Sequence, residues 1–160
     1  MSQLVFLPMG RAAATALRDS GTAAGQLTGT AATRELIRAH EYADSELEDA
    51  EFAALSYAGV LSVLEPGDPL RLVVVAEMPA GDVTPTAGDP YGTVIVRRMS
   101  WSQVQSLFSD EASTEGAVSA ARAVAQGHAL ADAVALPPVQ TLTEDFDLLW
   151  YSPEELDLLP

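Results

Sequence analysis

Few side chains of this 160-residue sequence could do chemistry. The chain has no cysteine and no lysine, so it lacks a thiolate nucleophile, a thiolate metal ligand, a Schiff-base amine and a phosphate-binding lysine. It also has no Gly-x-Ser-x-Gly, His-Glu-x-x-His or calcium-loop pattern. Two histidines, the arginines and many carboxylates remain. We therefore predict no catalytic residue, no metal site and no cofactor.

The two histidines are the first candidates for chemistry. His40 lies next to Glu41 and shortly before Asp44, so it could be a base oriented by a carboxylate, or a metal ligand. The alternative is an exposed histidine at the end of a helix, where the helix dipole favours it. His128 directly follows a glycine that is predicted to end a helix. We favour the structural interpretation for both residues.

Arg97 and Arg98 form the only adjacent basic pair. They end a predicted strand, so their side chains point to opposite faces and only one could serve a given site. An arginine in so acidic a chain could bind an anionic ligand, although salt bridges to the surplus carboxylates are the favoured explanation. Arg97 and Arg98 are kept as candidate ligand-binding residues.

The loop over 79–92, PAGDVTPTAGDPYG, is long for a connection in a compact domain. Such loops are either mobile or functional, and we favour mobility here. As a functional loop it could act as a lid over an anionic ligand, with Tyr91 as its one aromatic contact. Tyr91 therefore joins the two arginines as a candidate ligand-binding residue.

The acidic residues between 41 and 51 precede and begin the clearest helix. Ser45 and Glu48 are spaced as a capping box, and acidic side chains favour the start of a helix. A divalent cation is the alternative explanation for these carboxylates. The helix that follows, over 45–65, is apolar well beyond one stripe, which predicts that other elements cover it on two sides.

The net charge of −15 limits the choice of partner. Because negative charge repels phosphate backbones, we expect no binding to nucleic acid. Residues 141–160 carry six acidic residues and no basic one. This acidity serves solubility, or it attracts a basic partner. No apolar run is long enough to cross a bilayer and the start lacks a basic signal-peptide region, so we expect a cytoplasmic protein without a membrane contact.

The order of predicted elements suggests an α+β fold. Strands are predicted over 4–8, 70–78, 93–98, 106–110 and 147–151, and helices over 11–20, 32–40, 45–65 and 114–127. The glycines at 21, 25 and 29 indicate a mobile connection, and Pro137–Pro138 an irregular crossing segment. This order resembles β-α-β-β-α-β with extra helices after the first strand. It predicts one domain over 1–160, a two-layer sandwich related to the ferredoxin-like fold, with a mixed or antiparallel sheet.

The stretch FDLLWYS, followed by PEELDLLP, ends the sequence. Its adjacent aromatic residues, Trp150 and Tyr151, could belong to a docking tail. However, Ser152, Pro153 and Glu155 are spaced as the start of a helix, so an ordered element follows at once. On a strand the two aromatic side chains point to opposite faces, which predicts one in the core and one near the surface.

Four segments together resemble a family of small acidic actinobacterial proteins known only as a domain of unknown function. They are VFLP at 5–8, ELEDAEFAAL at 46–55, RLVVVAEMP at 71–79 and LLWYSPEEL at 148–156. The resemblance implies a single domain that spans the whole chain and a bacterial, cytoplasmic setting. It implies no activity and no functional residue.

Three functions remain open, in order of preference. The first is a non-enzymatic interaction or regulatory module, either a homodimer or bound to another protein, that uses an apolar patch or an acidic face. The second is a domain that binds a small anionic molecule under the 79–92 loop. The third is a hydrolase or isomerase that uses carboxylates and His40.

Overall fold

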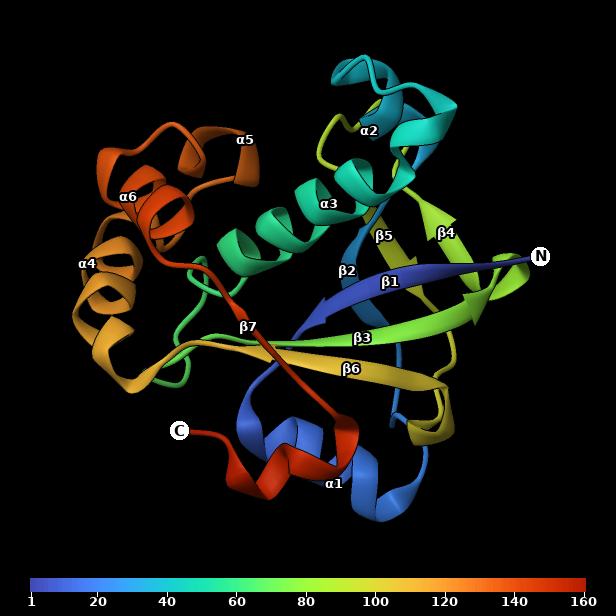
Figure 1. The fold of residues 1–160 in the computed structure, drawn as a ribbon, viewed down its shortest axis with the longest axis horizontal. Helices are drawn as coiled ribbons and strands as arrows, with labels where there is room; N and C mark the ends of the chain where they lie inside the picture. Colours follow the sequence, from blue (N-terminus) through green and yellow to red (C-terminus); the bar gives the residue numbers. More distant parts are fainter.

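A seven-stranded antiparallel sheet forms the centre of the computed structural model, which describes residues 1–160 (Figure 1). The strands lie in the order β4-β5-β2-β1-β3-β6-β7. Their bounds are β1 Ser2–Pro8, β2 Leu27–Ala31, β3 Leu72–Pro79, β4 Val83–Pro85, β5 Thr93–Val96, β6 Val104–Ser109 and β7 Leu149–Tyr151. The predicted α+β class is confirmed, and of the two sheet types left open the sheet is the antiparallel one.

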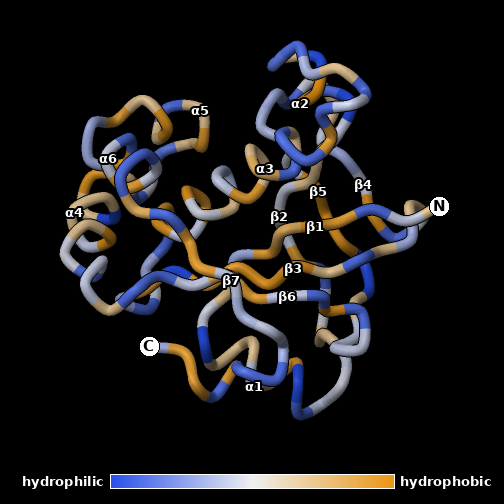
Figure 2. The backbone as a smooth tube through the Cα atoms, viewed as in Figure 1, coloured by the Kyte–Doolittle hydropathy of each residue, from blue (hydrophilic) through white to orange (hydrophobic).

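The predicted apolar strands lie in the middle of the sheet. β1 pairs along its whole length with β3, from Ser2 opposite Pro79 to Pro8 opposite Val73, and β3 pairs with β6 on its other side. Both faces of β3 are buried, which explains its nearly continuous apolar sequence. Figure 2 shows the same apolar character along the neighbouring strand β1.

The glycine-rich connection after α1 was predicted to be mobile, and this prediction is wrong for its second half. Leu27–Ala31 forms β2, which lies between β1 and β5. A side chain at Gly29 would meet the carbonyl oxygen of Phe6 on β1, so the glycine is required by the close approach of the two strands. Periodicity missed β2 because its sequence, LTGTA, has too few apolar residues.

Helices cover both faces of the sheet. α1 and the 3-10 helix η5 lie on one face, where Leu17, Leu156 and Leu159 join the largest apolar cluster. α3 lies across the other face and contacts β1, β2 and β3, and α4, α5 and α6 form a small bundle near its end (Figure 1). The bounds are α1 Arg11–Ser20, α2 Arg34–Ala39, α3 Leu47–Leu61, α4 Glu115–Ala125, α5 Leu130–Ala133, α6 Pro137–Asp145 and η5 Pro153–Leu158.

α3 is covered on two sides, as its wide apolar surface predicted. Ala54 and Ala58 pack with the sheet, and Val60 packs with α4 and α6. The predicted capping box does not form. The chain enters α3 through a 3-10 turn, and the Glu46 carboxylate accepts the backbone N–H of Ala43 at 2.9 Å instead. Leu47, the first residue of α3, is exposed.

Pro137 and Pro138 were predicted to prevent regular structure, but they begin α6. The first helical residues have backbone N–H groups without a partner inside the helix, so a proline there removes no hydrogen bond. Val139 and Leu142 then pack against α4. The proline pair therefore marks a helix start.

Candidate functional site

The last strand of the sheet, β7, leaves one of its sides without a partner. Its only neighbour is β6, with Leu107 opposite Tyr151, Phe108 opposite Trp150 and Ser109 opposite Leu149. No other strand pairs with its outer side. An unpaired strand edge presents backbone N–H and C=O groups that can pair with another chain.

The two adjacent aromatic residues of β7 point to opposite faces, as predicted. Tyr151 packs against the apolar cluster under α1 and η5. Trp150 lies beside Phe108 on the α3 face, and 60% of its surface is exposed. Leu149 is also exposed. The open edge of the sheet therefore carries a large apolar side chain in contact with solvent.

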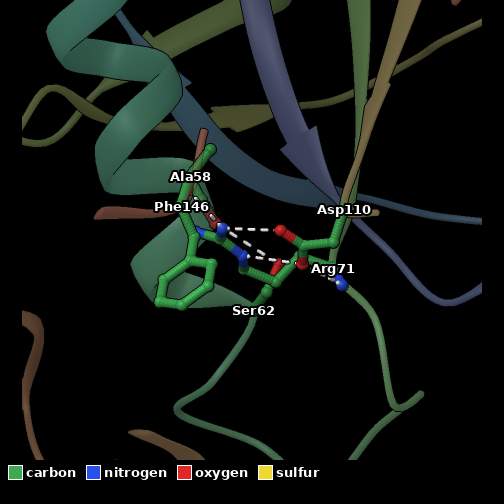
Figure 3. A network of polar contacts seen from close by, with 5 residues as sticks. All are labelled: Ala58, Ser62, Arg71, Asp110 and Phe146. Carbon is green, nitrogen blue, oxygen red and sulfur yellow. Dashed lines mark hydrogen bonds and ion pairs between the residues drawn. The ribbon is translucent and has the colours of Figure 1, made fainter. Parts of the chain in front are cut away.

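A buried ion pair holds the chain that leads into β7 (Figure 3). Arg71, only 3% exposed, donates from Nε and Nη2 to the two carboxylate oxygens of Asp110, at 2.9 and 2.7 Å. Nη2 also donates to the carbonyl oxygen of Phe146 at 3.1 Å, just before β7. The backbone N–H of Arg71 donates to Asp110 at 2.8 Å. One buried network thus connects β3, the end of β6 and the start of the last strand.

Gly59 makes room for this network inside α3. A Cβ at position 59 would lie 3.0 Å from Nη1 of Arg71, tighter than an ordinary contact. Glycine in a helix interior costs about 1 kcal/mol relative to alanine, so the residue needs a reason, and the guanidinium supplies it. Neither Arg71 nor Asp110 was a candidate from sequence. Arg71 directly precedes β3 and Asp110 directly follows β6, and the pairing of these strands, with Leu72 opposite Ser109, brings the two residues together.

The segment after β7 is packed into the core. Leu156 and Leu159 are buried, and Arg11 of α1 donates to the carbonyl oxygens of Leu159 and Pro160 at 3.0 and 3.1 Å. Arg18 of α1 forms an exposed ion pair with Asp157 at 2.9 Å. The C-terminal segment is therefore a structural part of the domain, as its helix-start residues predicted.

Exposed acidic side chains flank β7 in the sequence and follow the end of its paired strand. Asp145 and Asp147 precede β7, Glu154 follows it, and Glu111 follows the paired strand β6; all four are exposed. No arginine or lysine occurs after Arg122 in the sequence. Because none of these four carboxylates forms an ion pair, the edge carries uncompensated negative charge.

The opposite edge of the sheet holds the predicted ligand-binding residues, and the fold separates them. The 79–92 segment contains a 3-10 turn, β4 and the turn into β5, so most of it belongs to an edge hairpin. Tyr91 precedes β5 and Arg97 follows it, which places them at opposite ends of this strand. Arg97 donates weakly to the carbonyl oxygen of Gly81 at 3.4 Å, and Arg98 is exposed without a hydrogen bond. The three candidates do not converge on one site.

His40 belongs to an aromatic group between α2, α3 and the 79–92 segment. It is half-buried, not exposed as predicted, because the ring stacks on Tyr42. Since the carbonyl oxygen of Leu36 only accepts, Nδ1 carries the proton and donates to it at 3.0 Å. In the neutral ring Nε2 then accepts from the Tyr57 hydroxyl at 2.8 Å, and Tyr57 packs edge-on against Tyr91.

No carboxylate hydrogen bonds to His40, so the carboxylate-oriented base considered from the sequence does not form. Burial raises the pKa of the Tyr57 hydroxyl above its usual value of about 10, and the nearby hydroxyls of Tyr91 and Tyr42 add to this effect. His128 is exposed. No group of three or more histidine and acidic side chains is arranged to hold a metal ion. The aromatic group is best explained as the packing that holds the hairpin against α3.

Among these regions, the β7 edge has exposed groups that suit a specific kind of binding. It combines unpaired backbone groups, an exposed indole and surrounding carboxylates. These are the elements for adding a strand from another polypeptide, in which backbone hydrogen bonds provide affinity and alternate side chains provide specificity.

No helix of the protein has both the length and the apolar character to cross a membrane.

Comparisons with known proteins identify the family of this chain. Neither the curated proteins nor the solved structures include a chain that matches this one significantly. The model of a family of unknown function, DUF6912, matches residues 4–159, and the chain therefore belongs to that family.

Proposed function

We propose that the protein is an interaction module that binds a basic, extended segment of a partner protein at the outer edge of β7. The observation that carries this proposal is the exposed Trp150 on an unpaired edge strand. Proteins usually blunt such edges with charge, proline or a covering element, so an open edge with a large apolar side chain indicates a docking surface.

The charge around β7 supports a basic partner. Asp145, Asp147, Glu154 and Glu111 are exposed and unpaired, so an arginine or lysine on an added strand would find carboxylates on both sides of Trp150. An arginine opposite Trp150 could also stack on the indole face, which contributes about 0.5–2 kcal/mol depending on desolvation. Electrostatic attraction would also accelerate the encounter.

The same charges disfavour a second copy of the chain at this edge. Two β7 strands paired with each other would bring two sets of these carboxylates together, and like charges across a strand pair are destabilising. A heterologous partner therefore fits the edge better than a homodimer. The anionic-ligand hypothesis loses support because its candidate residues are separated, and the catalytic hypothesis because His40 has no carboxylate partner.

A blocked peptide of about seven residues that alternates arginine with valine tests the proposal. Isothermal titration at low salt should show binding to the full chain, and a matched peptide that alternates glutamate with valine should not bind. Trp150→Ala should weaken binding of the basic peptide at least about tenfold while the fold stays intact by circular dichroism. N-methylation of alternate peptide amides should abolish binding if a strand is added.

Phe52→Ala is the control variant. Phe52 is another exposed aromatic residue on an acidic surface, but it lies on α3 and not on a strand edge. This variant should bind the peptide as the natural chain does. The proposal is wrong if Phe52→Ala and Trp150→Ala weaken binding equally, because the peptide would then respond only to charge and apolar area. A dimer that dissociates in Trp150→Ala, seen by light scattering, would show a second copy as the occupant.

A further inference from the structure

A cavity of about 470 Å³ lies away from the outer side of β7, where the link between β1 and α1 meets the end of α3. Its volume falls within the range of small-molecule sites, which is roughly 300–1,000 Å³. Met9, Leu61, Leu64 and Leu70 supply its apolar wall. The cavity is therefore large enough and apolar enough for a small amphiphile.

The segment over 62–68 forms one wall of the cavity, and it is held from two sides. Arg122 of α4 donates to the carbonyl oxygens of Ser62, Glu65, Gly67 and Asp68, at 2.8–3.5 Å. The Asp68 carboxylate in turn accepts the first backbone N–H of α1, from Arg11, at 2.6 Å. A wall that is rigid before binding lowers the entropy cost of holding a ligand.

Arg71 supplies an unused donor group. It lines the cavity, and its Nε and Nη2 bind Asp110 and Phe146, whereas Nη1 has no hydrogen-bond partner. Every fully enclosed polar side-chain atom of the protein has a partner, so Nη1 is not fully enclosed, although it also packs against Gly59 of α3. The hydroxyl of Ser62, a residue that also lines the cavity, makes only a long hydrogen bond of 3.4 Å to the carbonyl oxygen of Ala58 (Figure 3).

The charges at the cavity select an uncharged head group. Arg71 and Arg122 line it together with Glu65 and Asp68, so both signs are present. A ligand with a net charge would be attracted by one pair, repelled by the other, and would lose its hydration on entry. A primary amide avoids this cost because its oxygen can accept from Nη1 of Arg71 while its N–H groups donate to a carboxylate.

We infer that this cavity binds a small uncharged amphiphile whose head group both accepts and donates hydrogen bonds, such as an aliphatic amide. The aliphatic part lies against Met9, Leu61 and Leu64, and the head group lies between Arg71 and the carboxylates of Glu65 and Asp68. This inference does not depend on strand addition at β7, because none of the cavity residues belongs to β7.

Hexanamide, hexanoate and hexylamine are probes with one chain length and three head-group charges. Titration of the full chain, followed by backbone amide NMR shifts, should show that hexanamide binds in the millimolar range and shifts Gly10, Ser62 and Leu70. Hexanoate and hexylamine should bind at least about tenfold more weakly, because each must give up hydration of a full charge. Equal binding of hexanoate or hexylamine would overturn the proposed ligand class.

Two serine variants, one within α3 and one at its C-terminal end, locate the site. Ser62→Phe fills the cavity and should reduce hexanamide affinity at least about tenfold, since the added ring occupies the ligand volume. Ser56→Phe is the matched control, because Ser56 donates to the carbonyl oxygen four residues earlier, as Ser62 does, but does not line the cavity. Binding that survives Ser62→Phe, or no binding of any probe to the natural chain, would refute the inference.

Discussion

The two edges of the sheet are built in different ways. At one edge, β4 forms a hairpin with β5, the next strand in the sequence, and its exposed residues are Thr84 and Pro85. At the other edge, β7 arrives from a distant part of the sequence and exposes Trp150. Pro85 has no backbone N–H to offer an added strand, whereas β7 contains no proline. The comparison shows one edge that resists strand addition and one that permits it.

The anchoring of the two edges differs as well. Local contacts hold the β4 edge, since Asp89 accepts the backbone N–H groups of Tyr91 and Thr93 within the same turn. Contacts distant in sequence hold the β7 edge: Arg71 binds the carbonyl oxygen of Phe146, and Leu156 lies in the core. An edge that receives a partner strand, as we propose for β7, must stay in place while its outer side is unpaired, and these anchors behind the strand would hold it there.

The largest effect is expected from removing the β7 edge. Truncation after Asp147 deletes β7 together with the buried residues Leu156 and Leu159, and the remaining protein should be unfolded at 25 °C by circular dichroism. Leu156→Ala should alone lower the free energy of unfolding by about 2–5 kcal/mol, because it leaves a cavity in the core. Leu158→Ala, at a side chain that is 77% exposed, should leave it unchanged. A folded truncated protein would mean that β7 is only an appended docking tail.

The anchor behind β7 should be the next most sensitive feature. Asp110→Asn leaves the buried guanidinium of Arg71 without its counter-charge, and urea denaturation should show a loss of about 3–5 kcal/mol. Asp157→Asn removes the acidic partner of Arg18 from an exposed ion pair, and it should change the midpoint of urea denaturation little. Similar effects of the two variants would contradict the proposed anchoring role of the buried pair.

The β4 edge should depend on one glycine at the base of its hairpin. Gly92 has a left-handed φ of 74°, and an added Cβ would meet the carbonyl oxygen of Ala31 on β2. Gly92→Ala should therefore cost about 3 kcal/mol, from backbone strain and the steric clash together. Gly88→Ala, at a φ of 71° but with open space around it, should cost only about 1 kcal/mol. Equal losses of stability for Gly92→Ala and Gly88→Ala in thermal denaturation would show that backbone strain alone, without the steric clash, sets the cost of the substitution.

The smallest effect should come from the aromatic group that holds the hairpin against α3. Burial raises the pKa of Tyr57 in the folded protein, so the unfolded chain releases this proton first as the pH rises above about 10. The unfolded state then binds fewer protons, and stability falls as the pH passes through the folded pKa, whereas the contribution is fully present below pH 10.

Tyr57→Phe should flatten this alkaline decline. At neutral pH it should cost about 1 kcal/mol, from the lost hydrogen bond to His40. Denaturation midpoints between about pH 8 and 11 check both effects. An unchanged alkaline decline would show that another tyrosine titrates.

The sequence predicted those parts of the fold in which neighbouring residues carry the signal. The apolar runs at β1 and β3 were found in place. The sequence missed β2 because its glycine is explained only by a neighbouring strand. It misjudged Pro137–Pro138 because a proline pair can either interrupt or begin a helix, and the packing of α6 on α4 decides which.

For the candidate site, the sequence by itself determined that Trp150 and Tyr151 point to opposite faces, because side chains alternate along any strand. It also determined the acidic surroundings and the absence of thiol and amine chemistry. Only the tertiary structure decided that β7 lies at the end of the sheet and that Arg71 meets Asp110 behind it. The physical reason is that alternation and capping act within a few residues, whereas the order of strands follows from contacts between residues far apart in the chain.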